Sequence, residues 1–135
     1  MLEVIIIDDD QIVIFIQKKM IINHQISTNP VSFKKAAKAL AYLNEEGADL
    51  SKEFLILLDI NMPGMSGWEF LDCLENHEQK AKYHVIMVTS SIDNKDKTEA
   101  EKYATVRSFI EKPISREDCE QLKNIPEISK FFQKV

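Results

Sequence analysis

The stretch Val4-Ile5-Ile6-Ile7-Asp8-Asp9-Asp10 joins an apolar run directly to consecutive acids. A continuous run of branched apolar residues is typical of a strand that is covered on both faces, as in a parallel sheet. A second run of this character, residues 54–58, ends at Asp59. Because the carboxyl ends of parallel strands lie at one edge of the sheet, we expect the acids of both strands to meet there. Crowded carboxylates resist ionising beside one another, so the sequence predicts an acidic pocket that a divalent cation would stabilise.

Strand and helix signals alternate along the whole chain. We expect strands at residues 3–7, 25–28, 54–58, 84–88 and 106–110, and helices from 10, at 33–45, near 68–74, at 93–102 and from 115 to about Pro126. These βα units in succession predict an α/β fold, a five-stranded, doubly wound parallel sheet of the flavodoxin-like (βα)5 type in a single domain. We place that domain at residues 1–124 and a C-terminal tail at residues 125–135.

Local signals predict where the helices begin and end and which face is buried. Asp10 is the expected N-cap of the first helix, Gly47 ends the second, and Ser115 with Asp118 has the order of a capping box. The charged segment 93–102 reads as a solvated helix with little to bury. The first helix carries residues at helical spacing that we expect to form its inward face: Ile12, Phe15, Ile16, Lys19 and Met20.

The composition is that of a globular domain without a nucleic-acid or membrane signature. Apolar residues make up 44% and charged residues 29% of the 135 residues, and the net charge of −5 gives no basic surface for DNA or RNA. No apolar stretch approaches the roughly 20 residues that span a bilayer, and no signal-peptide pattern precedes the first strand. Cys73 and Cys119 lack metal-site spacing, so we expect two structural thiols in a reducing, cytoplasmic setting.

Polar side chains follow four of the expected strands: Asp8 and Asp9, Asp59, Thr89, and Lys112. Mg²⁺ prefers oxygen ligands. Asp9 and Asp59 are therefore candidate direct ligands, a backbone carbonyl near Asn61 is a candidate third, and Asp8 could hold a metal-bound water. Thr89 offers a hydroxyl and Lys112 a positive charge to phosphoryl oxygens. A carboxylate nucleophile, a metal and such donors together suit phosphoryl transfer.

Four segments, taken in order, resemble those of a known family. They are Asp8-Asp9, the stretch Leu57-Leu58-Asp59-Ile60-Asn61-Met62-Pro63-Gly64-Met65-Ser66-Gly67, Thr89-Ser90, and Phe109-Ile110-Glu111-Lys112-Pro113. Together they resemble the receiver domain of two-component response regulators, of the single-domain type, over residues 3–122. Each motif alone has low specificity, but all of them in this order on the expected elements make a highly specific match.

The resemblance implies a phosphorylation site. Asp59 would accept a phosphoryl group from a sensor histidine kinase or a histidine phosphotransfer protein. Mg²⁺ would be held by Asp9, Asp59 and the Asn61 backbone carbonyl, with Asp8 in an outer role. Thr89 would bind the phosphoryl oxygens.

The resemblance also implies how the signal leaves the site. Lys112 would bind phosphoryl oxygens beside Thr89, and the peptide between Lys112 and Pro113 is often cis in this family. Thr89 and Phe109 would then switch the surface of the fourth helix, fifth strand and fifth helix, where a downstream protein binds. Such a domain is a regulatory phosphoacceptor that assists only its own phosphorylation and dephosphorylation, so it is not an enzyme. We expect a monomer or weak homodimer.

Two other functions remain open from the sequence. One is a phosphorylation-independent scaffold of the same fold, although intact Asp59, Thr89 and Lys112 argue against it. The other is an aspartyl-phosphate hydrolase of the haloacid-dehalogenase type, which also uses a strand-end aspartate and Mg²⁺. That class needs an aspartate where this chain has Asn61, and a cap insertion for which there is no room. Flavin binding is a fold-level analogy only.

Overall fold

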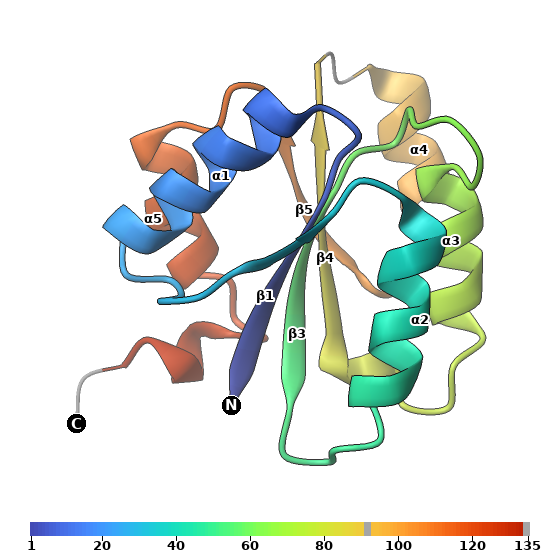
Figure 1. Cartoon of the computed structure of the whole chain (residues 1–135), viewed down its shortest axis with the longest axis horizontal. Coiled ribbons are helices and arrows are strands. Elements are labelled where there is room, and N and C mark those ends of the chain that lie inside the picture. The colour runs from blue at the N-terminus through green and yellow to red at the C-terminus, as the bar shows by residue number, and fades with distance from the viewer. Residues whose placement is uncertain (91–92, 134–135) are drawn as a thin grey trace.

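A computed structural model of the chain describes residues 1–90 and 93–133 and contains one parallel sheet (Figure 1). The strand order is β2-β1-β3-β4-β5, so the chain winds outward from β1 in both directions. The strands are β1 (Leu2–Ile7), β2 (Val31–Phe33), β3 (Glu53–Leu58), β4 (Tyr83–Thr89) and β5 (Val106–Glu111). The predicted five-stranded, doubly wound fold is confirmed.

Helices cover both faces of the sheet. They are α1 (Gln11–Asn23), α2 (Ala36–Glu46), α3 (Gly67–Glu75), α4 (Asn94–Ala100) and α5 (Arg116–Lys123), with short 3-10 turns η1 (Lys80–Lys82) and η2 (Ser129–Phe131). Helices α1 and α5 lie on one face, and α2, α3 and α4 lie on the other (Figure 1). None of the helices in the described part of the chain is long and apolar enough to cross a membrane.

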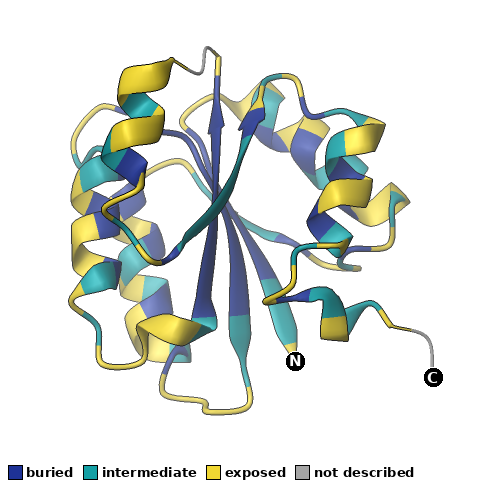
Figure 2. Cartoon of the chain, turned by 180° about the vertical axis from the view of Figure 1, so that it is seen from behind, coloured by how far each residue is buried: buried dark blue, intermediate teal, exposed yellow. Residues whose placement is uncertain are grey.

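The strands are buried because their side chains alternate between two apolar layers. Ile5, Ile56 and Val85 belong to the layer under α2 and α3, whereas Ile6 and Leu57 belong to the layer under α1 and α5. Figure 2 shows the central strands as the most continuously buried part of the chain. This two-sided burial explains why their sequences read as unbroken apolar runs.

Side-chain caps fix most of the helix starts. Asp10 accepts a hydrogen bond from the backbone N–H of Ile12, as predicted. Ser115 and Asp118 form the predicted capping box, and Ser66 with Glu69 forms another at the start of α3. Helix α4 buries only its last residue, in agreement with a solvated helix.

The predicted second strand is wrong. Residues 25–28 form a turn and loop, and the strand lies after Pro30, at Val31–Phe33. Gln25 has φ of +59°, a left-handed conformation that ends α1 and cannot continue into a strand. The strand itself is only three residues long, too short to show an alternating pattern.

The predicted inward face of α1 is also wrong, except at Met20, which is half-buried and packs against the layer under α1 and α5. The buried residues are Ile14, Gln17 and Ile21, whereas Ile12 and Phe15 are exposed. Because apolar residues occur nearly all round this helix, their spacing does not identify one face. The expectation of two structural thiols holds for buried Cys119 and fails for Cys73, which is exposed on α3.

The segment after α5 packs back on the domain. Ile128 is fully buried in the layer under α1 and α5, and Phe131 and Phe132 pack against it. Lys130 forms an ion pair with Glu53 at the start of β3. The last two residues of the predicted tail, 134–135, lie outside the described part of the chain.

Candidate functional site

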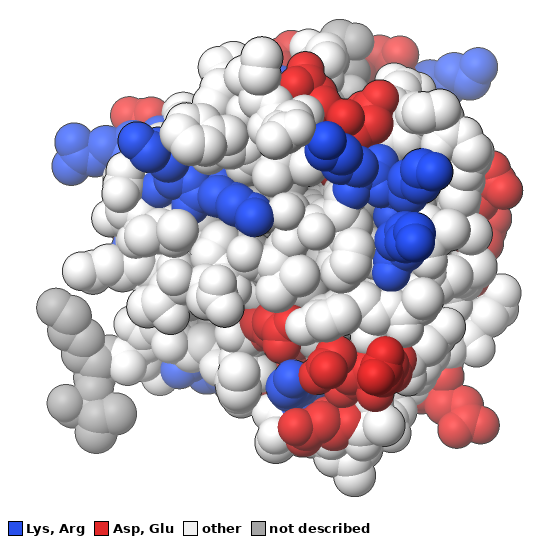
Figure 3. Space-filling view, in the orientation of Figure 1, with Lys and Arg blue, Asp and Glu red and all other residues white. Residues whose placement is uncertain are grey.

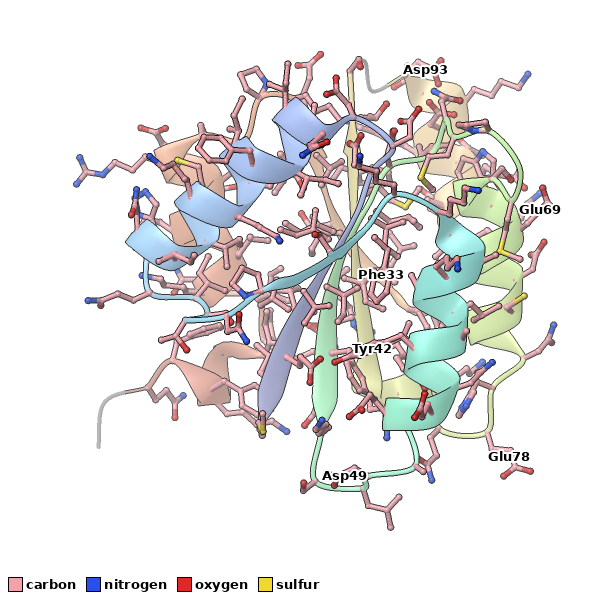
Figure 4. The ribbon with its side chains drawn as sticks, in the orientation of Figure 1. Phe33, Tyr42, Asp49, Glu69, Glu78 and Asp93 are labelled. Carbon is pink, nitrogen blue, oxygen red and sulfur yellow. The ribbon has the colours of Figure 1, made fainter. Side chains whose placement is uncertain are left out.

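The acids at the ends of β1 and β3 are placed by hydrogen bonds that continue the sheet. The backbone N–H of Asp59 donates to the carbonyl of Ile7, and that of Asp8 donates to the carbonyl of Phe33. Asp8 and Asp59 therefore stand on neighbouring strands at the same edge. Figure 4 helps to locate this edge: Asp93 and Glu69 mark that end of the molecule, and Asp49 and Glu78 mark the opposite end.

Three carboxylates converge at this edge. Asp8, Asp9 and Asp59 each offer an oxygen, and these oxygens lie within 4.8 Å of one another. Asp8 and Asp59 are buried, with 1% and 6% of their surface exposed, while Asp9 is exposed. Burial raises the pKa of the Asp59 carboxyl above its usual value, and the charge of Asp8 adds to this rise. Lys112 and the backbone N–H of Asn61 act in the opposite direction.

Lys112 supplies the positive charge of the site. Its Nζ lies 2.7 Å from Oδ2 of Asp8 and 3.6 Å from Oδ2 of Asp59. Burial lowers the pKa of Lys112, but the two carboxylates outweigh burial and the pKa is raised. The backbone N–H of Lys112 donates to the carbonyl of Thr89, which joins the ends of β4 and β5. The peptide between Lys112 and Pro113 is cis, as the resemblance implied.

The loop from Asp59 to α3 is shaped by two glycines. Gly64 has φ of +78°, which glycine adopts without strain. Gly67 is packed so closely that a Cβ there would lie 2.8 Å from Cα of Ile60 and 2.9 Å from the carbonyl oxygen of Asp59. Its N–H also donates to the carbonyl of Ile60. The backbone beside Asp59 thus depends on a residue eight positions later in the chain.

The other predicted residues lie on the strands beside this pocket. Thr89 is buried at the end of β4 and pairs in register with Glu111. Phe109 lies further down β5, opposite Met87, and packs half-buried against the layer under α2 and α3. Asn61 is exposed in the loop that follows Asp59.

The pocket fits a hard divalent cation by its chemistry. Its donors are carboxylate oxygens, the ligands that Mg²⁺ prefers. Oδ2 of Asp8 is enclosed, and its contact with Lys112 has the distance of an ion pair without the geometry of a hydrogen bond. One lysine facing three carboxylates leaves the cluster with excess negative charge, which a cation would offset.

The model of the response regulator receiver domain family matches residues 4–123, nearly the whole chain. The chain belongs to this family. Among solved structures, a two-component response regulator from Cytophaga hutchinsonii has a TM-score of 0.82 at 33% identity, covering 91% of this chain and 94% of that one. A response regulator receiver protein from Dyadobacter fermentans has a TM-score of 0.79 at 28% identity, covering 92% and 97%.

Curated relatives of this receiver domain are longer proteins. The transcriptional regulatory protein CitT of Halalkalibacterium halodurans is 30% identical over 119 residues, which are 88% of this chain and 49% of that protein. The probable methanogenesis regulatory protein FilR2 of Methanothrix harundinacea is 31% identical over 96 residues, which are 70% of this chain and 59% of that protein. The chain thus spans about half the length of these two relatives.

The burial of one polar residue near the site could not be predicted from the sequence. Gln17 is 2% exposed, on a helix where a polar residue is expected to face water. Its buried position follows from the orientation of α1, which the apolar spacing did not reveal. It faces a cavity that borders Lys112.

Proposed function

We propose that Asp59 of this receiver domain accepts a phosphoryl group from a phosphohistidine donor, and that the phosphorylated domain signals by protein–protein contact. One observation carries the proposal: buried Asp59 lies beside Asp8 and within 3.6 Å of Lys112, at the strand-end edge. A carboxylate in this position has an ammonium group within reach of any phosphoryl oxygens that it receives.

The proposed step is a displacement at phosphorus. An oxygen of the Asp59 carboxylate forms the new P–O bond, the P–N bond to the donor imidazole breaks, and the imidazole takes up a proton from water. Lys112 would follow the charge by turning from Asp8 toward the phosphoryl oxygens. This turn is short, because Lys112 already contacts both carboxylates.

We assign a Mg²⁺ site to the same residues. Asp9, Asp59 and the backbone carbonyl of Asn61 would hold the ion, with Asp8 in an outer role. When bound, Mg²⁺ would supply positive charge that offsets the carboxylates and the incoming phosphoryl group. The converging oxygens of the three aspartates support this assignment.

The output would pass through Thr89 and Phe109. A phosphoryl group adds about −1.5 to −2 charges and three acceptor oxygens, and the hydroxyl of Thr89 would move to bind one of them. Phe109, half-buried in the neighbouring strand, would turn inward and change the surface of α4, β5 and α5. The unphosphorylated domain would populate this state as a minor form.

The same proposal names the partners and setting. The phosphoryl donor would be a sensor histidine kinase or a histidine phosphotransfer protein, and the phosphorylated domain would bind a downstream protein, with no nucleic acid or membrane involved. The domain acts on no separate substrate, so it is a regulatory phosphoacceptor and not an enzyme. It works in the cytoplasm as a monomer or weak homodimer, with residues 1–124 as the receiver and 125–135 as a tail.

Acetyl phosphate and Mg²⁺ test the proposal directly. Trp68 lies one residue past Gly67 and stacks on Tyr103 with ring centroids 6.1 Å apart, so its fluorescence reports on the loop after Asp59. We expect a Mg²⁺-dependent fluorescence change and an intact-mass gain of one phosphoryl group in the wild type. Neither should occur in Asp59→Asn.

Asp10→Asn is the matched control, because Asp10 caps α1 and lies beside the acid cluster without belonging to it. That variant should gain the phosphoryl group as the wild type does. No mass gain in the wild type would leave the phosphorylation-independent scaffold. Steady release of phosphate from many substrate equivalents would instead favour the hydrolase.

A further inference from the structure

The start of β1 is paired on one side only. Strand β3 pairs with β1 from Leu2 onward, whereas β2 pairs only with residues 5–7. Figure 1 shows the N-terminal half of β1 as the outermost strand at that end of the sheet. An unpaired strand edge of this kind is a template onto which another extended chain can pair.

The backbone of Leu2 points toward the unpaired side. Along a strand, the N–H and carbonyl groups of successive residues point alternately to the two sides. The carbonyl of Met1 accepts a hydrogen bond from the N–H of Glu53, on the β3 side. The N–H of Asp8 donates to the carbonyl of Phe33, on the β2 side. Even-numbered residues therefore face β2, and among the described residues no backbone group bonds the N–H or carbonyl of Leu2 there.

The loop between α1 and β2 does not supply the missing partner. The N–H of Ile26 donates to the carbonyl of Ile21 in α1. The N–H of Asn29 donates to the hydroxyl of Ser27 within the loop. Since these bonds tie the loop to itself and to α1, no described residue between α1 and Val31 pairs with the backbone of Leu2.

A cavity of about 550 Å³ lies at this edge, within the roughly 300–1,000 Å³ range of ligand pockets. One of its walls is apolar and lies on the α1 side, with Leu2, Ile22 and Ile26. The other wall is polar and lies on the α2 side, with the carboxylate of Glu3 and the hydroxyl of Tyr42. We call this cavity, bounded by these five residues, the edge pocket.

The polar wall carries excess negative charge. The hydroxyl of Tyr42 donates to Glu3, and burial together with this bond raises the pKa of Tyr42 to about 12, so the hydroxyl keeps its proton. Nζ of Lys52 contacts the carboxylates of both Glu3 and Glu46, so one ammonium group faces two carboxylates. Figure 3 shows acidic side chains gathered around one basic side chain over the lower ends of β3 and α2.

We propose that the edge pocket binds an extended segment of a protein partner, which adds a short strand beside Leu2. A peptide backbone presents a donor and an acceptor together, which match the N–H and carbonyl of Leu2. A free cation would meet the charge of Glu3 but leave this backbone unpaired.

The two walls select the sequence of the added strand. Side chains of a strand alternate between its two faces. The fitting segment therefore places an apolar residue against Ile22 and Ile26 and the next residue, a lysine or arginine, toward Glu3. The edge pocket lies at the opposite end of β1 from Asp8, so this binding does not require the proposed phosphorylation.

Strand addition is tested with the peptide acetyl-Val-Lys-Val-Lys-Val-amide on the whole chain, without acetyl phosphate or Mg²⁺. We expect chemical-shift changes at the backbone amides of Leu2 and Ile26, and slower hydrogen exchange at Leu2. A peptide with N-methyl groups on its three central residues cannot donate these backbone hydrogen bonds and should bind about ten-fold more weakly. Unchanged binding of the N-methyl peptide, or no shift at Leu2, would overturn the proposal and leave the proposed phosphoacceptor untouched.

The charge preference is tested at Glu3. Glu3→Gln keeps an acceptor for Tyr42 and should weaken binding of the lysine peptide about three-fold, the effect of one partly exposed ion pair. Glu45→Gln, at an exposed position of α2 outside the pocket, is the matched control and should bind as the wild type does. A peptide with glutamates in place of the lysines should bind less tightly; equal binding of the two peptides would contradict a cationic partner.

A single residue distinguishes a strand from a small ligand. Acetyl-lysine methylamide carries one side chain and two amide groups, so it can fill only part of the edge pocket. It should bind far more weakly than the five-residue peptide. If it binds as tightly, the pocket takes a small amide ligand and the extended partner is excluded.

Discussion

Lys112 and Asp8 form an ion pair, with Nζ 2.7 Å from Oδ2, in which the carboxylate is almost fully buried and the lysine side chain is 17% exposed. The ammonium of Lys112 lies closer to Asp8 than to Asp59, whose Oδ2 is 3.6 Å away. In the absence of Mg²⁺, Lys112 therefore compensates the charge of buried Asp8 more than that of Asp59. The lysine thus stabilises the acidic pocket before any phosphoryl group arrives.

Replacing Lys112 should destabilise the metal-free domain. Lys112→Met leaves Asp8 buried beside Asp59 without a cation, and we expect the free energy of unfolding to fall by about 2 kcal/mol. This is less than the roughly 3–5 kcal/mol of a fully buried pair, because the lysine keeps some solvent contact. Urea denaturation in EDTA measures the loss, and Mg²⁺ should restore most of it. Lys34→Met, an exposed lysine, is the control; equal losses in both variants would contradict this role of the pair.

Removing the charge of Asp59 should have the opposite effect. Burial and the neighbouring Asp8 raise the pKa of Asp59, so its ionised form is disfavoured in the folded domain. Asp59→Asn removes that cost, and we expect the metal-free variant to be more stable than the wild type at pH 7. Thermal melts with and without Mg²⁺ provide the measurement: Mg²⁺ should raise the Tm of the wild type and scarcely that of the variant. A lower Tm for Asp59→Asn than for the wild type in EDTA would show that burial and Asp8 do not disfavour the ionised Asp59 carboxylate.

The two glycines of the loop after Asp59 should respond differently to alanine. At Gly67 a Cβ would press on backbone atoms of Ile60 and Asp59, so Gly67→Ala must shift the loop, at a cost of about 2 kcal/mol. At Gly64 nothing lies within 4 Å, so Gly64→Ala meets only the cost of a positive φ, about 1 kcal/mol. Mg²⁺ titration followed by Trp68 fluorescence should show weakened affinity in Gly67→Ala alone. Equal Mg²⁺ affinity in both variants would show that the backbone packing at Gly67 does not influence the metal site.

The sheet and the acidic pocket could be predicted because their signals are local and strong. Each central strand is buried on both faces and therefore reads as an unbroken apolar run, and the acids at Asp8 and Asp59 directly follow two such runs. Parallel pairing then brings strand ends together without further information. The register Ile7 to Leu58 in β1 and β3 confirms that step.

The orientation of α1 and the position of β2 could not be predicted because they depend on tertiary contacts. Helix α1 is apolar nearly all round, so packing against α5 and the sheet decides that Ile14 and Ile21 are buried and Phe15 is not. Strand β2 gains its place by pairing with Ile5 to Ile7, and its own three residues carry no pattern. Phe33 is held there by contact with Tyr42 of α2, whose ring centroid lies 5.3 Å away (Figure 4).

A buried histidine far from the acidic pocket should make stability depend on pH. His84 is buried at the start of β4, where its Nε2 lies 2.8 Å from Glu53 and its Nδ1 accepts a hydrogen bond from Nε of Arg107. Both contacts are satisfied by the neutral ring, with Nε2 as the donor, whereas a proton on Nδ1 would face the N–H of Arg107. Burial lowers the pKa of His84 below its usual 6.5, and Arg107 adds to this, while Glu53 opposes it.

The folded domain therefore binds fewer protons at His84 than the unfolded chain does once the pH falls below about 6.5. Stability is fully present above that pH and is lost as the pH decreases toward the lowered pKa of the folded state, with a slope of at most about 1.4 kcal/mol per pH unit. Urea denaturation between pH 7.5 and 5 measures this slope. His84→Gln keeps a donor and an acceptor but cannot titrate, so its stability should fall less steeply over the same range. Parallel profiles for the two proteins would show that His84 does not govern the response, and that carboxylates common to both account for it.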